Sequence, residues 1–117
     1  HKVFCWGDDP DPNWANYGDS EIDATSSVGC FPANGYGLHD MIGNVWEWTR
    51  SLWKPYPYVP NDAKREDLHA DDLRVLRGGS WRNDRDFARC ACRSGNHPDY
   101  RFVYDGFRVV LLRSSPV

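Results

Sequence analysis

Two cysteines one residue apart, Cys90 and Cys92, begin the stretch of this sequence that is richest in chemically active side chains. With Cys5 and Cys30 they bring the chain to four cysteines in 117 residues, an even number that permits disulfides but is low for a disulfide-rich scaffold. Neither a CxxC pair nor an HxxxH pair, spacings typical of a zinc site, occurs. We favour four reduced and mostly buried thiols, with a disulfide, or a metal or catalytic role, as the open alternatives.

Polar and aromatic side chains crowd residues 81–105, which we call the 81–105 face. Tyr and Phe give rigid contact area at low entropy cost, while Ser, Asn and Asp give adaptable hydrogen bonds, a mixture typical of binding surfaces. We therefore predict a ligand-binding face; the alternative is that Phe87, Phe102 and Tyr104 are core residues. The predicted ligand-binding residues are Trp81, Asn83, Asp84, Phe87, Ser94, Asn96, His97, Tyr100, Phe102, Tyr104 and Asp105.

Charge and hydropathy narrow the possible partners. The net charge is -3 and the signs are mixed, so no nucleic acid is predicted as a partner. No apolar run approaches the roughly 18 residues of a membrane span, so no membrane is predicted either. No targeting signal is visible, which favours a cytoplasmic location, with secretion as the alternative. We expect the arginines of the 81–105 face to pair with the acidic first half; they are Arg82, Arg85, Arg89 and Arg93.

Loops must position most of these side chains. Residues 1–37 are dense in Gly, Pro, Asp and Asn, which predicts loops held together by side chains. Prolines exclude a helix and a central strand over residues 54–60, and the charged residues 61–72 are expected to form a surface loop. With few backbone ladders, such loops need Asp and Asn hydrogen bonds or a bound hard cation.

Short strands are predicted where apolar residues alternate or run together. Residues 44–49 alternate and predict one strand, and residues 38–42 before it are expected to form one helical turn. Residues 73–81 predict a strand that breaks at its Gly-Gly pair (78–79), and residues 106–112 predict another. The chain should therefore fold as an irregular, loop-rich α+β domain with short strands and little helix.

Separated motifs in this chain resemble one known family. They are GYGLHDMIGNVWEWT at residues 35–49, RVLRGGSW at 74–81, and RCACRSGNHPD followed by GFRVV within 89–110. Together they resemble the formylglycine-generating enzyme/sulfatase-modifying-factor superfamily over nearly the whole chain. The resemblance implies a C-type-lectin-like fold with a small twisted antiparallel sheet.

The resemblance also sets the expected domain organisation. Residues 1–117 would form a single domain that is the C-terminal part of a larger, bacterial one. The family's N-terminal half has no counterpart in this chain. We expect that half as a partner, either in a separate chain or in another segment.

Catalysis by the oxidases of this family depends on two cysteines shortly after GGS. The first would fall at Asn83, and the second falls in a segment that this sequence lacks, while Cys90 matches a non-catalytic cysteine of the family. Cu(I) requires soft thiolate ligands, which Asn83 cannot supply. We favour a non-catalytic domain; the alternative is the C-terminal half of a formylglycine-generating or sulfoxide-synthase-type oxidoreductase.

One branch of the superfamily carries a variable region in this stretch, diversified by retroelements through adenine-directed mutagenesis. The chain resembles that branch, and almost all of the predicted ligand-binding residues are types that such codons reach; Trp81 is the exception. The resemblance implies a variable-type surface that binds a protein or a small molecule.

Calcium is the cofactor that the resemblance implies. One structural site maps to the side chains of Asp40 and Glu47 and to the backbone carbonyls of Gly43 and Val45. Carboxylates mixed with carbonyls around a glycine suit Ca²⁺. The alternative is that Asp40 caps a turn and Glu47 pairs with an arginine. A second site maps to two further residues, Asn16 and Tyr17.

Overall fold

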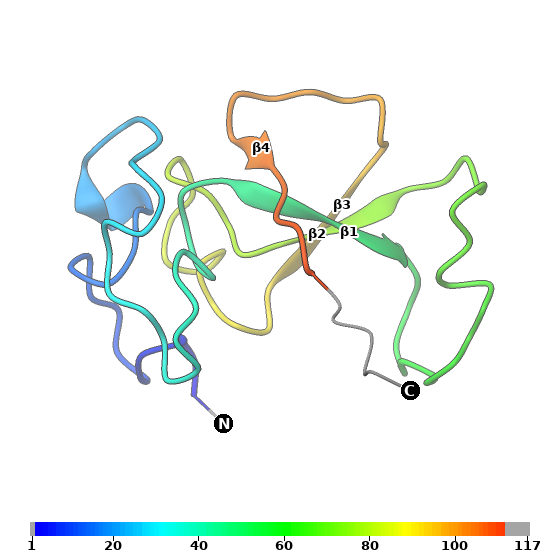
Figure 1. Cartoon of the computed structure of the whole chain (residues 1–117), viewed down its shortest axis with the longest axis horizontal. Coiled ribbons are helices and arrows are strands. Elements are labelled where there is room, and N and C mark those ends of the chain that lie inside the picture. Colours follow the sequence, from blue (N-terminus) through cyan, green and yellow to red (C-terminus); the bar gives the residue numbers. More distant parts are fainter. Residues whose placement is uncertain (1, 112–117) are drawn as a thin grey trace.

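A four-stranded sheet lies between long loops in the computed structural model, which describes residues 2–111 (Figure 1). The strands β1 (Trp46–Leu52), β2 (Arg74–Arg77), β3 (Arg93–Asn96) and β4 (Asp105–Gly106) lie in the order β3-β2-β1-β4. The β1–β2 and β2–β3 pairs are antiparallel, whereas β4 is parallel to β1. Within these residues a short 3-10 turn, η1 (Gly18–Ser20), is the one helical element, and no helix could cross a membrane. The expected loop-rich fold with little helix is confirmed, although the sheet is mixed.

β1 and β2 form where the sequence predicts strands. Aromatic residues and a threonine favour β1, and its first residue, Trp46, is buried. β2 buries both Val75 and Leu76, which point to opposite faces of the sheet. It ends at the predicted break, where Gly78 and Gly79 have φ values of +94° and +73°. This left-handed backbone favours glycine, so the chain can leave the sheet there.

Ring stacking and asparagine hydrogen bonds hold the N-terminal loops in place of backbone ladders. The ring of Trp6 stacks on Phe4 at 5.2 Å and on Tyr17 at 6.4 Å, and both of these partners are buried. The carbonyl of Asn16, a buried residue, accepts a hydrogen bond from the backbone N–H of Asn44 at 2.7 Å. These contacts fix the loops against the start of β1.

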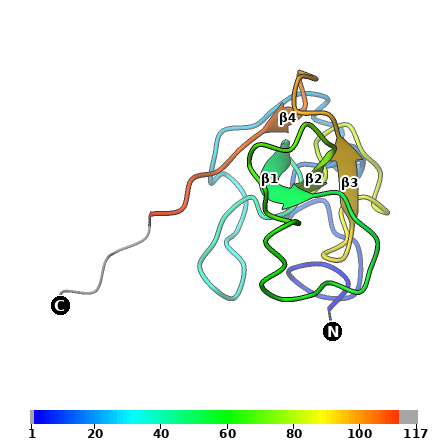
Figure 2. The same cartoon turned by 90° about the vertical axis from the view of Figure 1, so that its right-hand side faces the viewer.

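Two predicted elements do not form as expected. Residues 38–42 make bends rather than a helical turn, because Asp40 has a left-handed φ of +53° that a right-handed helix cannot contain. The strand predicted over residues 106–112 is limited to β4. Residues 107–111 lead away from the sheet (Figure 2) and so lack a strand partner, while residue 112 lies outside the described residues.

The cysteines are free thiols, but the prediction that most are buried is wrong. Cys30 and Cys90 are exposed, and Cys5 and Cys92 are half-buried. Burial raises the pKa of the Cys92 thiol, and burial together with the nearby Cys90 raises the pKa of Cys5. A raised pKa favours the thiol over the reactive thiolate.

Gly43 offers a test of the close loop packing. It has φ of +79°, and an added Cβ would overlap the backbone of Asn16. Gly37 has φ of +74° with nothing within 4 Å of an added Cβ, so it is a matched control. We expect Gly37→Ala to cost about 1–2 kcal/mol of unfolding free energy from backbone strain, and Gly43→Ala to cost about 1–3 kcal/mol more from the overlap. Urea denaturation measures both, and equal losses would contradict the close approach.

Candidate ligand-binding face

The 81–105 face runs across the sheet from one edge to the other. Residues 81–92 form loops after β2, and β3 is one edge strand. Residues 97–104 then arch over to β4, the opposite edge strand (Figure 1). Pairing of β3 with β2 and of β4 with β1 therefore fixes both ends of this arch.

Four rings follow one another along the arch and form what we call the ring row. His97 lies 6.2 Å from Tyr100, Tyr100 lies 6.1 Å from Phe102, and Phe102 stacks on Tyr104 at 5.1 Å, measured between ring centroids. Tyr100 is 56% exposed and Phe102 is 43% exposed. The alternative that Phe102 is a core residue is therefore wrong, and the same holds for Phe87, which is also 43% exposed.

Two hollows adjoin the ring row. The first, about 340 Å³, is lined by Trp46, Leu76, Ser80, Arg82, Asn83, Phe87, Ser94, Asn96, Tyr104 and Asp105. The second, about 320 Å³, is lined by Trp48, Pro98, Tyr100, Arg101, Phe102, Asp105, Gly106 and Phe107. The structure thus brings most of the predicted ligand-binding residues together around two neighbouring hollows that share Asp105.

Asp105 carries a carboxylate that the protein satisfies only in part. Its Oδ2 atom is buried and has no hydrogen-bond partner among the described residues. Burial raises the pKa of Asp105, and the Phe102 backbone opposes this with a weaker lowering effect. The ionised carboxylate is therefore poorly compensated, which is costly in a partly desolvated site.

The remaining predicted residues, Trp81, Asp84 and His97, lie beside the hollows. Trp81 is half-buried, and its backbone N–H donates to Asn44 O at 3.0 Å. Asp84 is exposed, and its Oδ1 accepts the N–H of Asp86 at 2.9 Å. His97, at the start of the ring row, has its Nε2 atom 3.1 Å from a carboxylate oxygen of Asp71. Trp81 therefore anchors the face, while His97 extends it.

Asn83 is held firmly at the position where the resemblance places a catalytic cysteine. The hydroxyl of Ser80, a buried residue, donates to Asn83 Oδ1 at 2.7 Å. The backbone carbonyl of Asn83 accepts the N–H of Gly18 at 2.7 Å. Asn83 therefore connects the first hollow to η1 through hydrogen bonds.

A larger cavity lies away from the 81–105 hollows. It measures about 760 Å³, and its wall includes Phe4, Tyr36, Met41 and Ile42, as well as the thiols of Cys5 and Cys90. None of the predicted ligand-binding residues lines it. We therefore treat this cavity as the main competing site for a ligand.

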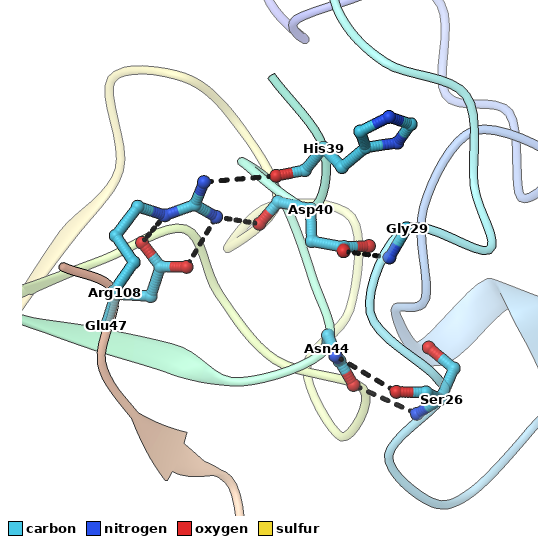
Figure 3. Close-up of polar contacts among 7 residues, drawn as sticks. All are labelled: Ser26, Gly29, His39, Asp40, Asn44, Glu47 and Arg108. Carbon is cyan, nitrogen blue, oxygen red and sulfur yellow. Dashed lines mark hydrogen bonds and ion pairs between the residues drawn. The ribbon is translucent and has the colours of Figure 1, made fainter. Parts of the chain in front are cut away.

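Arg108 lies among the oxygen atoms of the first predicted calcium region (Figure 3). Its Nε and Nη2 atoms donate to the two carboxylate oxygens of Glu47 at 2.7 and 2.6 Å. The same guanidinium donates to the carbonyls of His39 and Asp40 at 3.1 and 2.9 Å. The Glu47 pairing raises the pKa of Arg108, although burial opposes the effect.

The two carboxylates of that region point to different partners. Asp40 Oδ2 accepts the N–H of Gly29 at 2.7 Å and faces away from Glu47 (Figure 3). Within residues 2–111, no three His, Cys, Asp or Glu side chains cluster as metal ligands would. As arranged, these oxygens fit the guanidinium of Arg108 better than a Ca²⁺ ion, and calcium stays a prediction.

The second predicted calcium region is closed by hydrogen bonds within the chain. Asn16 Oδ1 accepts the hydroxyl of Ser20 at 3.2 Å, and its Nδ2 donates to Ala24 O at 2.9 Å. The carbonyl of Tyr17 accepts the Ser20 hydroxyl at 2.6 Å. Through these hydrogen bonds Asn16 and Tyr17 stabilise the loop around η1, and the second calcium site stays a prediction.

Sequence patterns missed the arginines that contact rings. Arg82 lies over Tyr104 at 5.8 Å, and Arg93 lies over Trp53 at 4.3 Å. The expected pairing with the acidic first half is confirmed for Arg85, 2.9 Å from a carboxylate oxygen of Asp19. An arginine repeat gives no sign of which partner each side chain takes.

Comparisons with known proteins agree on a family. A family model described as the sulfatase-modifying factor enzyme 1-like domain matches residues 1–112. The chain is 32% identical to the formylglycine-generating enzyme of Mus musculus, covering 92% of this chain and 33% of that protein. It is 36% identical to the hercynine oxygenase of Mycobacterium tuberculosis, covering 92% and 27%. The solved structure of Treponema denticola variable protein 1 matches with a TM-score of 0.67 and 32% identity, covering 81% and 34%.

These comparisons confirm the predicted superfamily and its fold. The resemblance to the variable-protein branch is also supported, by the match to variable protein 1. The chain spans between about a quarter and a third of the length of these two curated relatives (27% and 33%).

Arg108 provides the test of how this part of the molecule is held. We expect Arg108→Lys to lower the free energy of unfolding by about 1–3 kcal/mol, because it breaks the two-pronged contact with Glu47. Arg50→Lys is the matched control, since Arg50 lies 3.8 Å from Glu66 and its side chain is largely exposed. That control should change the free energy by less than about 1 kcal/mol. Equal effects in urea denaturation would contradict the role given to Arg108.

Proposed function

Because the chain belongs to the sulfatase-modifying factor enzyme 1-like family, we propose that it is a non-catalytic recognition domain that binds a protein or small ligand on the 81–105 face. The observation that carries this proposal is the ring row, whose Tyr100 and Phe102 are exposed beside two hollows on an arch fixed at both ends. Exposed aromatic groups next to polar side chains are the usual chemistry of a binding surface.

The chemistry of the thiols and of Asn83 supports binding rather than catalysis. Asn83 lies where the oxidases of the resembled superfamily would place a cysteine, and its side chain accepts a hydrogen bond from Ser80. Burial raises the pKa of Cys5 and Cys92, which disfavours the thiolate that a nucleophile or a soft metal requires.

The similarity to two oxidoreductases favours a second candidate function. The formylglycine-generating enzyme and the hercynine oxygenase match this chain over 33% and 27% of their length. The chain would then be one part of an oxidoreductase whose reactive groups lie on another segment. Stoichiometric copper or iron bound once the chain is combined with that other segment would favour this candidate over the first.

We propose further that the 81–105 face is of the variable type and is diversified by a retroelement. The match to variable protein 1 supports this reading, as do the Asn, Asp, Tyr, His, Phe and Ser residues of the face. Sequencing of related gene copies tests it. Substitutions confined to the predicted ligand-binding positions would support diversification, whereas substitutions spread evenly over the chain would contradict it.

Calcium is proposed as a structural ligand of residues 40–47, where the D-x-x-G-x-x-x-E pattern supplies carboxylates and carbonyls. Binding requires the carboxylate of Asp40 to leave the N–H of Gly29 and the guanidinium of Arg108 to leave the carboxylate of Glu47. We expect Ca²⁺ added to EDTA-treated protein to raise the free energy of unfolding, by about 2.7 kcal/mol at a hundredfold excess over Kd. Asp40→Ala should remove the gain and Asp9→Ala, at an exposed loop position, should keep it. No gain with Ca²⁺, or an equal gain with Asp40→Ala, would contradict the proposal.

The ring row gives the direct test of the binding function. Peptides are selected from a random library on the wild-type chain, and their affinities are then measured for variants. We expect the combined Tyr100→Ala, Phe102→Ala and Tyr104→Ala variant to bind at least about tenfold more weakly, because exposed aromatic anchors dominate interface energies. Tyr36→Ala is the control, at a 91% exposed ring outside the face, and should change affinity less than about twofold.

Two outcomes would contradict the binding function. The triple variant could bind the selected peptides as tightly as the wild-type chain does. Alternatively, it could lose its folded circular dichroism spectrum, which would show that the three rings hold the fold together.

A further inference from the structure

Asp105 lies where the two hollows of the 81–105 face meet, and its charge is not neutralised within the described chain. It lines both hollows, and its Oδ2 atom is buried without a hydrogen-bond partner. None of the ion pairs formed by residues 2–111 includes it. An unpaired charge in a partly buried position is energetically unfavourable. A hydrogen-bond donor supplied by a ligand would therefore stabilise this carboxylate.

Two arginines of the chain share these hollows with Asp105 without pairing to it. Arg82 lines the first hollow, and its guanidinium lies over the ring of Tyr104 at 5.8 Å. Arg101 lines the second hollow and is exposed. The charge of Asp105 is therefore left for a group supplied from outside.

Aromatic rings surround this carboxylate. Trp46, Phe87 and Tyr104 line the first hollow with it, and Tyr100 and Phe102 line the second. Ring faces attract cations, and arginine more often than lysine makes this contact in proteins. A carboxylate bordered by rings thus provides both a charge partner and a desolvated wall for a guanidinium group.

The same chemistry already occurs elsewhere in the chain. The guanidinium of Arg93 lies 4.3 Å from the ring of Trp53 and 4.2 Å from that of Tyr56. The guanidinium of Arg65, a buried side chain, lies 4.9 Å from the ring of Tyr58. Rings of this protein therefore hold guanidinium groups readily, although those sites are filled by its own arginines.

We propose that the 81–105 face takes an arginine side chain of a protein partner, with Asp105 as the charge partner and the ring row as the wall. The inference rests on the proposed binding function of this face. It names the group that the face recognises, whereas the proposed function only names the face.

N-acetyl-L-arginine amide and N-acetyl-L-citrulline amide are the probes, because citrulline has nearly the same shape without the charge. Each is titrated into the full chain while amide chemical shifts are recorded by NMR. We expect the arginine probe to shift the signals of Asp105 and Tyr104 and to bind at least about tenfold more tightly than the citrulline probe. The lysine analogue should bind more weakly than the arginine probe, because it cannot stack as a planar group.

Two variants make the test specific to Asp105. Asp105→Asn should abolish the preference for arginine over citrulline while leaving the unfolding midpoint unchanged or higher, because it removes a poorly compensated charge. Asp86→Asn is the matched control, because Asp86 is an exposed acid of the same stretch that lines neither hollow, and it should keep the preference. A lower midpoint for Asp105→Asn would instead show that the charge of Asp105 stabilises the fold, and it would contradict the claim that this charge is poorly compensated.

Equal affinity for the two probes, or a preference that survives Asp105→Asn, would overturn the inference. The library selection separates this failure from failure of the proposed function. Selected peptides that contain no arginine and still bind the ring row would contradict the proposed arginine recognition and leave the proposed binding function intact. Selected peptides that never contact the 81–105 face would contradict both the arginine recognition and the proposed binding function.

Discussion

The guanidinium of Arg108 connects three parts of the chain: β1, the loop that precedes β1, and the segment that follows β4. It donates to the carboxylate of Glu47 in β1 and to the carbonyls of His39 and Asp40 in the preceding loop. Arg108 comes two residues after the end of β4, so this contact also holds β4 parallel to β1. Because β4 ends the 97–104 arch, the position of the ring row depends on it. The charges of Arg108 and Glu47 neutralise each other at a half-buried position. This ion pair thus fixes the ring row, which the short β4 ladder alone would hold weakly.

The face is made mostly of loops, and contacts with the rest of the chain hold several of them. Ring stacking and isolated backbone hydrogen bonds replace the missing ladder: Trp6 stacks between rings, and the backbone carbonyl of Asn16 accepts a hydrogen bond from the backbone N–H of Asn44. Asn83 connects the first hollow to η1. A binding surface that is ordered before its ligand arrives loses less conformational entropy on binding.

Strong local patterns made β1, β2 and the Gly78–Gly79 break predictable, and separated motifs identified the superfamily. β3 was missed because Ser, Gly and Asn have little strand propensity, so its pairing with β2 is decided by tertiary structure. The contact between Arg108 and Glu47 spans 61 residues, a separation about which periodicity says nothing. The apolar run after β4 suggested a long strand, but that segment turns away from its partner. The residues of the face were predicted from the chemistry of their side chains. The sequence could not show that Asp105 lies between the two hollows with a buried, unpartnered oxygen, because this depends on how the arch folds.

The central claim is that ligands bind at the ring row and its two hollows and not in the larger cavity near the N-terminus. Amide hydrogen exchange, measured with and without a peptide selected on the wild-type chain, tests it most directly. We expect slower exchange on peptide binding over residues 93–105, with little change over residues 34–42, which line the larger cavity. Slower exchange confined to residues 34–42, with unchanged exchange over 93–105, would contradict the claim.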